Sequence, residues 1–243
     1  MVYCADAYIK LEKSVTSLYT DEQLLPAAIV SRHMYNSRTP DLLVEIRKLA
    51  LMSDRTLYIV AGCNGAGKTS MCFTLLPEIF SCLEFVNADE IARGLSPFRP
   101  AGVSMESGRI MLRRIDELIE QGTSFAFETT LAASIYLEKI RKAKVMGYRV
   151  ILMYIWVDNL ALAKQRVVTR VLEGGHHIPE EVIERRYVRS MRNLFGKYLT
   201  AVDGVFMLDN SFGDFTFIAK FTPASGLMEY DIERVAKLKS QAT

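Results

Sequence analysis

The 243-residue sequence is short of cysteine, of long apolar runs and of net charge. Its four cysteines, Cys4, Cys63, Cys72 and Cys82, show no metal-ligand spacing and are too scattered for a disulfide framework, which fits a reducing compartment. The longest apolar run, 150–157, is far below the roughly 20 residues that span a bilayer, and the first residues lack a secretion-signal pattern. We therefore expect a cytoplasmic protein without a membrane partner.

The charge is nearly balanced, with 30 basic and 28 acidic residues and a formal net charge of +2. Binding to nucleic acid depends largely on Lys and Arg that neutralise phosphates, so this balance argues against a nucleic-acid partner. Hydrophobic residues make up 50% of the chain, enough for the core of one compact domain with decorations.

Residues 1–54 are expected to form an N-terminal helical extension. Apolar residues recur at helical spacing in "PDLLVEIRKLALM", residues 40–52. No chemistry is apparent there, so we expect a role in packing, in contact with a partner, or in restraining the domain at 55–243.

From Thr56 onward, short apolar runs rich in β-branched and aromatic residues alternate with helical patterns. Strands are expected at 56–61, 83–87, 124–128, 148–157 and 204–209, and helices at 68–80, 108–122, 134–147, 159–173 and 179–199. This alternation predicts an α/β fold with a mostly parallel sheet flanked by helices. Residues 215–222 are expected to add a strand beside the fifth, followed by a final helix from about Met228.

The stretch "GCNGAGKTS", residues 62–70, fills the G-x-x-x-x-G-K-[ST] template between a predicted strand and a predicted helix. Glycines let the backbone turn tightly toward phosphates, and the helix start adds its positive end. We expect Lys68 to reach the β- and γ-phosphates and Thr69 to provide a hydroxyl to Mg²⁺. The residues predicted to bind the nucleotide are Gly62, Asn64, Gly65, Ala66, Gly67, Lys68, Thr69 and Ser70.

The rest of the sequence favours a kinase over other users of the same loop. The signature of an ABC-type ATPase and the guanine-reading Asn-Lys-x-Asp of a GTPase are absent from it. A small-molecule kinase needs a carboxylate near the terminal phosphate, an acceptor pocket and arginines that close over the phosphates. Candidates for each are present.

Two carboxylates follow predicted strands and so are expected at the carboxyl edge of the sheet. Asp89 is positioned to take a proton from an acceptor hydroxyl; the alternative is that it caps the next helix. Glu128 is positioned to hold Mg²⁺ through water or to bind acceptor hydroxyls with Thr129 and Thr130. The alternative for Glu128 is a strand end that faces water.

Cationic residues gather on two predicted helices near the C-terminal half. The two groups are Arg166 with Arg170, and Arg185 with Arg189 and Arg192. The glycine-containing segment 173–178 joins them, which suggests a lid that closes on the nucleotide. The alternative is two solvated helix faces, and His176 and His177 are interpreted as lid or surface residues.

Four motifs together resemble the zeta-toxin family of P-loop kinases. They are "VAGCNGAGKTS", "VNADEIARGLSP", "FETTL" and "RVVTRVLEGGHHIPEEVIERRYVRSMRNL", in family order across residues 55–210. The resemblance is to a branch described as predicted ATPase or kinase. It implies a P-loop NTPase/kinase fold with a five-stranded sheet of order 2-3-1-4-5.

The resemblance also implies an activity: ATP- or GTP-dependent phosphorylation, with Mg²⁺, of a UDP-linked N-acetyl amino sugar. It implies an antitoxin-like protein partner that blocks the nucleotide site. Carried over to this sequence, Lys68 and Thr69 match the nucleotide loop and Asp89 the catalytic base. Asn87, Glu128, Thr129 and Thr130 are assigned to the acceptor. Arg170 and one of Arg185, Arg186 or Arg189 match the phosphate-binding arginines, of which we assign Arg189.

The residues also allow a second function, a nucleotide-dependent switch ATPase that acts on RNA or on a protein partner. Its discriminating feature would be phosphate release without a phosphorylated small product, or RNA binding with a strong dependence on salt.

Overall fold

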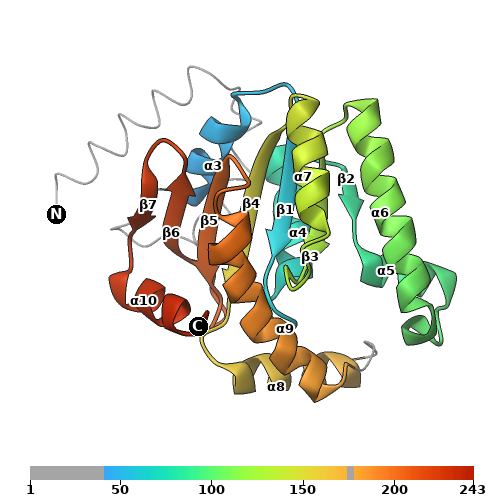
Figure 1. The fold of residues 1–243 in the computed structure, drawn as a ribbon. Coiled ribbons are helices and arrows are strands. Elements are labelled where there is room, and N and C mark those ends of the chain that lie inside the picture. Colours follow the sequence, from blue (N-terminus) through green and yellow to red (C-terminus); the bar gives the residue numbers. More distant parts are fainter. Residues whose placement is uncertain (1–40, 174–177) are drawn as a thin grey trace.

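The computed structural model describes residues 41–173 and 178–243, which form a layered α/β fold (Figure 1). Residues 1–40 of the expected extension and the expected hinge at 174–177 lie outside the described residues. The described residues form one seven-stranded sheet in the order β2-β3-β1-β4-β5-β6-β7. The strands are β1 (Thr56–Ala61), β2 (Glu84–Val86), β3 (Phe125–Thr129), β4 (Arg149–Trp156), β5 (Gly204–Asp209), β6 (Thr216–Thr222) and β7 (Gly226–Glu229).

The first five strands are parallel and confirm the predicted order 2-3-1-4-5. Two antiparallel strands extend these five, and of the two only β7 was not predicted. β6 lies beside β5, as predicted for 215–222. The final helix does not start near Met228, because 226–229 turn back to pair with β6 as the second arm of a hairpin.

Helices cover both faces of the sheet, with α7 in front of it and α4 behind it in Figure 1. The helices are α3 (Leu42–Ala50), α4 (Lys68–Phe80), α5 (Ala88–Leu95), α6 (Ser104–Gln121), α7 (Tyr136–Val145), α8 (Leu160–Leu172), α9 (Glu180–Asn193) and α10 (Ile232–Ser240). A short 3-10 turn, η1 (Pro100–Val103), precedes α6, and a π-helical turn, η2 (Leu194–Tyr198), follows α9. The predicted helix 179–199 is therefore divided at Asn193.

The core is the parallel part of the sheet, where β1 and β5 are buried at every position and β4 at all but its first. Near-continuous apolar strands bury both faces, as central parallel strands do. Helix α3 joins this core, because Leu42, Leu43 and Ile46 are buried and the helix contacts β4 and β5. The boundary between an extension and a domain at residue 54 remains a prediction.

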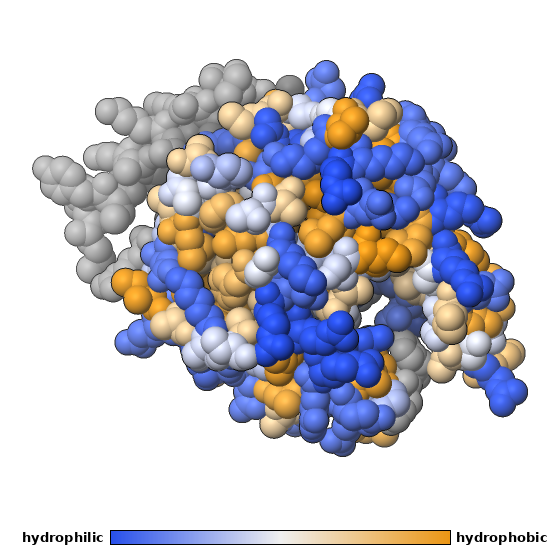
Figure 2. Space-filling model, in the orientation of Figure 1, coloured by the Kyte–Doolittle hydropathy of each residue, from blue (hydrophilic) through white to orange (hydrophobic). Residues whose placement is uncertain are grey.

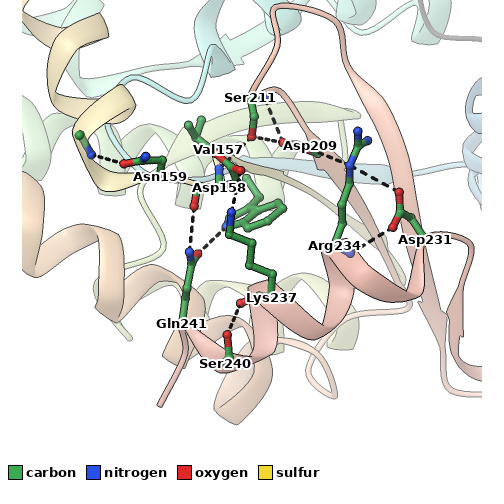
Figure 3. A network of polar contacts seen from close by, with 12 residues as sticks. Val157, Asp158, Asn159, Asp209, Ser211, Asp231, Arg234, Lys237, Ser240 and Gln241 are labelled. Atoms are coloured by element: carbon green, nitrogen blue, oxygen red, sulfur yellow. Dashed lines mark hydrogen bonds and ion pairs between the residues drawn. The ribbon is translucent and has the colours of Figure 1, made fainter.

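A polar network ties α10 to the carboxyl ends of β4 and β5 (Figure 3). The Gln241 side chain accepts from Trp156 Nε1 at 3.0 Å and donates to the Asp158 carbonyl at 2.8 Å. Arg234 Nε lies 3.3 Å from the buried carboxylate of Asp209. This edge of the sheet is therefore rigidly held. Among the described helices, none has the length and apolar character needed to cross a membrane.

Candidate active site

The glycine loop runs from the end of β1 into the first turn of α4. Gly65 and Gly67 have φ of +79° and +89°, a region that side-chain-bearing residues rarely adopt. A Cβ atom on Gly65 would lie 2.5 Å from the Ala163 carbonyl oxygen, and one on Gly67 would lie 2.5 Å from Asn210 Nδ2. The loop is thus confined between α8 and the segment after β5. Its N–H groups and those of the first turn of α4 lack helical acceptors, which suits phosphate oxygens.

Asn210, which the sequence analysis did not single out, anchors this loop. Its side chain is buried, and Nδ2 donates to the Ala66 carbonyl at 2.9 Å. Its backbone N–H bonds the Trp156 carbonyl, so the anchor is itself held against β4. A polar residue directly after the fifth parallel strand, at the edge that carries the glycine loop, was the available signal.

Glu128 is the centre of the site, because three other side chains that were predicted to belong to the site meet its carboxylate. Thr69 Oγ1 donates to it at 2.8 Å and Asn87 Nδ2 at 2.9 Å. Lys68 Nζ lies 3.6 Å from the other carboxylate oxygen and donates to the Cys63 carbonyl at 2.9 Å. The side chains of Lys68 and Glu128 are only 7% and 12% exposed, so water screens this pair weakly. The alternative of a water-facing strand end does not hold.

The pair Thr69 and Glu128 fits a magnesium ion. A hydroxyl and a carboxylate are oxygen ligands that Mg²⁺ prefers, and it commonly takes one or two side chains together with substrate phosphates. No cluster of three or more His, Cys, Asp or Glu suited to a metal occurs among the described residues.

Asp89 does not cap α5, because Asn87 does. Asn87 Oδ1 accepts from the N–H groups of Asp89 and Glu90 at 2.8 and 3.4 Å. This capping role was not foreseen, and because of it the Asp89 carboxylate in the first turn is not needed for the helix cap. That carboxylate is 43% exposed, and its Oδ2 lies 3.9 Å from Arg170 Nη1. Asp89 is thus available to a ligand.

The arginines of α8 and α9 are not equivalent. Arg170 has buried Nε and Nη2 atoms with no hydrogen-bond partner among the described residues. Arg186 Nη1 donates to Asn64 Oδ1 at 3.4 Å, and burial lowers the pKa of its guanidinium, which the charge of Asp89 opposes. Arg189 is exposed, and its assigned role remains a prediction. The surface over α9 is largely hydrophilic (Figure 2). The geometry places Arg186, not Arg189, at the glycine loop.

Comparisons with known proteins found a matching family model and a curated relative. The family model for "Zeta toxin" matches residues 96–211, a region that begins after Asp89 and includes Glu128 and Arg170. An uncharacterized protein of Haemophilus influenzae is 29% identical over 142 residues, which are 58% of this chain and 98% of that protein.

Two solved structures share the fold. The crystal structure of AvrRxo1-ORF1:-ORF2 with ATP aligns with a TM-score of 0.66 at 20% identity, over 83% of this chain and 71% of that one. The PezAT chromosomal toxin-antitoxin system of Streptococcus pneumoniae aligns with a TM-score of 0.54 at 14% identity, over 92% and 96%. The chain is therefore similar to zeta toxins over residues 96–211, and it shares its fold with these two neighbours.

In this fold, the remaining predicted residues lie around the same edge. Ser70 is exposed in the first turn of α4, and Thr130 is half-buried. Thr129 is buried, and its hydroxyl accepts from the Leu131 N–H at 3.1 Å. Thr129 therefore supports the loop after β3, and its contact with an acceptor remains a prediction.

Proposed function

We propose that this protein transfers the terminal phosphoryl group of ATP to a hydroxyl of a small molecule, with GTP as the alternative donor. The observation that carries the proposal is that Lys68 and Thr69 both contact Glu128. Beside them, the Asp89 carboxylate does not cap a helix and lies 3.9 Å from Arg170. A protein that binds a nucleotide only for switching does not need a carboxylate and an arginine, such as Asp89 and Arg170, for an acceptor hydroxyl.

Asp89 is the proposed general base. Its carboxylate accepts the proton of the acceptor hydroxyl as the oxygen of that hydroxyl bonds to phosphorus and the bond to the leaving diphosphate breaks. Arg170 Nη1 lies 3.9 Å from Oδ2 of this carboxylate.

The moving phosphoryl group carries negative charge that needs donors aimed at it. Arg170 Nε and Nη2 are such donors, because they are buried without a hydrogen-bond partner in the described part of the chain. Such groups are costly to leave unpaired, and a phosphate oxygen satisfies them. Arg186 adds a second positive charge at Asn64.

Lys68 and Glu128 hold the phosphate end. When bound, Mg²⁺ neutralises charge on the phosphate oxygens; Thr69 and Glu128 would hold it. In the structure, the Lys68 ammonium donates to the Cys63 carbonyl and lies 3.6 Å from the Glu128 carboxylate. We propose that triphosphate oxygens replace these two partners of Lys68.

The proposed acceptor is a UDP-linked N-acetyl amino sugar, on the strength of the zeta-toxin resemblance. The proposed partner is an antitoxin-like protein that covers the nucleotide site. The PezAT neighbour is a toxin–antitoxin system, and the AvrRxo1 neighbour is a structure of ORF1 together with ORF2. We place the reaction in the cytoplasm, where nucleotides and sugar nucleotides are available.

The test is incubation of the protein with ATP labelled in its terminal phosphate, with Mg²⁺, in three arms. The first arm contains UDP-N-acetylglucosamine, the second a metabolite extract, and the third water alone. The proposal expects a labelled sugar nucleotide in the first arm. A labelled product in the extract alone would overturn the acceptor but keep the transfer reaction.

The control is Lys68→Ala, which should abolish any product that the protein itself makes. Release of inorganic phosphate in all three arms, without a labelled organic product, would overturn the transfer reaction and favour the switch. Replacing ATP by GTP in the productive arm decides the donor.

A further inference from the structure

Leu131, in the loop after β3, has a backbone conformation that leucine rarely adopts. Its φ is +60°, and its side chain is fully buried. Left-handed backbone at a bulky residue is strained and persists only where the surroundings enforce it. The loop directly follows Glu128, Thr129 and Thr130, so the strain lies beside the proposed acceptor site.

Two buried hydrogen bonds hold Leu131. Its N–H donates to Thr129 Oγ1 at 3.1 Å, and its carbonyl accepts from Asn193 Nδ2 at 2.8 Å. The first bond is local, but the second comes from the last residue of α9, 62 positions later in the chain. Asn193 is only 8% exposed, so this bond does not compete with bulk water.

The π-helical turn η2 extends the same attachment. Tyr198, at its end, donates to the Ala133 carbonyl at 2.6 Å, and Lys197 donates to Ser134 Oγ at 2.7 Å. In a π turn, residues five apart lie on the same side of the helix, so Asn193 and Tyr198 reach the same loop. Such turns are frequent at functional sites.

The other part of α9 contacts the nucleotide loop. Arg186 precedes Asn193 by about two helical turns and donates to Asn64 Oδ1 at 3.4 Å. One rigid helix therefore contacts the phosphate-binding loop through Arg186 and the loop after β3 through Asn193. A displacement of α9 would move both contacts together.

We propose that Asn193 is a positioning residue for the acceptor side of the reaction. By holding Leu131 left-handed, it sets the path of the backbone from Glu128 through Thr130 relative to α9 and Arg186. This inference rests on the proposed phosphotransfer, and it adds a residue that touches neither nucleotide nor acceptor.

The main test compares Asn193→Asp with Ser190→Ala, using UDP-N-acetylglucosamine and Mg²⁺–ATP. The aspartate is isosteric but has no N–H to donate. Ser190 is the matched control, because it too makes a buried side-chain bond from α9, to the Tyr154 hydroxyl at 2.9 Å, away from the loop. We expect Asn193→Asp to lower kcat for transfer about 10- to 100-fold, as misplacement of reacting groups does, with the Kd for ATP unchanged.

Ser190→Ala should transfer at the rate of the parent protein. Equal slowing by both variants would show a merely structural role of α9 and overturn the inference, as would an Asn193→Asp variant with the parent rate. A second pair tests the backbone directly. Leu131→Gly and Leu131→Ala both remove the isobutyl group of leucine and differ only in the Cβ atom that alanine keeps. Only glycine accepts a left-handed conformation easily, so the glycine variant should transfer faster. The reverse order would contradict the proposal.

A parent protein that phosphorylates no acceptor would refute the proposed function. In that case, hydrogen exchange tests whether Asn193 holds the loop after β3. Asn193→Asp should speed exchange of the amides in 129–134, whereas Ser190→Ala should not. Unchanged protection of these amides in Asn193→Asp would overturn the inference on its own.

Discussion

Asp89→Asn should separate catalysis from stability. The substitution removes the proposed base and keeps the shape of the side chain. Loss of a general base slows reactions about 10²–10⁴-fold, which corresponds to about 2.7–5.4 kcal/mol in the activation free energy. Nucleotide affinity should change little, because the loop that holds the phosphates does not include this carboxylate.

The cost in folding free energy should be much smaller. Asp89 Oδ2 and Arg170 Nη1 are 3.9 Å apart, a separation at which two unit charges in water attract by about 1 kcal/mol. Both side chains are more than a third exposed, at 43% and 35%, so screening reduces this further. Asn87, not Asp89, caps α5, so the helix start is not affected. We expect a change below about 1 kcal/mol in the free energy of unfolding.

The assay is transfer of labelled phosphate under saturating ATP, with urea denaturation of the same preparations. Glu90→Gln is the matched control, because Glu90 is the next carboxylate along the same helical turn and pairs with Arg93 at 2.6 Å at the surface. It should leave the rate unchanged. Asp89→Asn transferring as fast as Glu90→Gln would refute the base assignment, and a large loss of stability in Asp89→Asn would refute the geometric argument.

Three further predictions concern the loop, its cysteine and the C-terminal helix. Gly65→Ala should abolish ATP binding in a titration, since its Cβ would overlap a carbonyl of α8, whereas Gly108→Ala, with open space in α6, should raise the unfolding free energy by about 0.5–1 kcal/mol. Burial raises the pKa of the Cys63 thiol to about 11, so about 0.1% is thiolate at pH 8 and alkylation should require denaturation; rapid labelling of the native protein, seen by mass spectrometry, would contradict this. Gln241→Ala leaves the Trp156 indole N–H without its acceptor and should cost about 1–3 kcal/mol, measured by urea denaturation with tryptophan fluorescence; an unchanged midpoint would argue against the network.

The parts of the fold that could be predicted are those encoded locally. The glycine loop, the apolar run of β4 and the strand end at Glu128 are short patterns whose structure depends on immediate neighbours. The order of the five parallel strands came from family resemblance. The start of the last helix was misplaced, because the pairing of 226–229 with β6 is a contact between strands that apolar periodicity does not report.

The sequence analysis named several residues that meet at the candidate site, but it missed Asn210 and did not predict the contacts among them. The Asn87–Glu128 bond spans 41 positions, the Arg186–Asn64 bond 122 and the Asn210–Ala66 bond 144. Of the two alternatives for Asp89, the capping role is excluded by the side chain of Asn87, which caps α5 itself. Among neighbouring arginines of one helix, spacing alone could not show which one faces the loop.

By itself, the sequence determined that a phosphate-binding turn joins a buried strand to a helix, because glycine, lysine and apolar runs act on the backbone within a few residues. Only the tertiary structure decided that Arg186 meets Asn64, that Asn87 caps the helix of Asp89 and that Asn193 holds a strained Leu131. Those contacts depend on how the strands are ordered and how α9 packs on the sheet. The strand order and the packing of α9 both depend on the burial of apolar residues from many helices and strands at once.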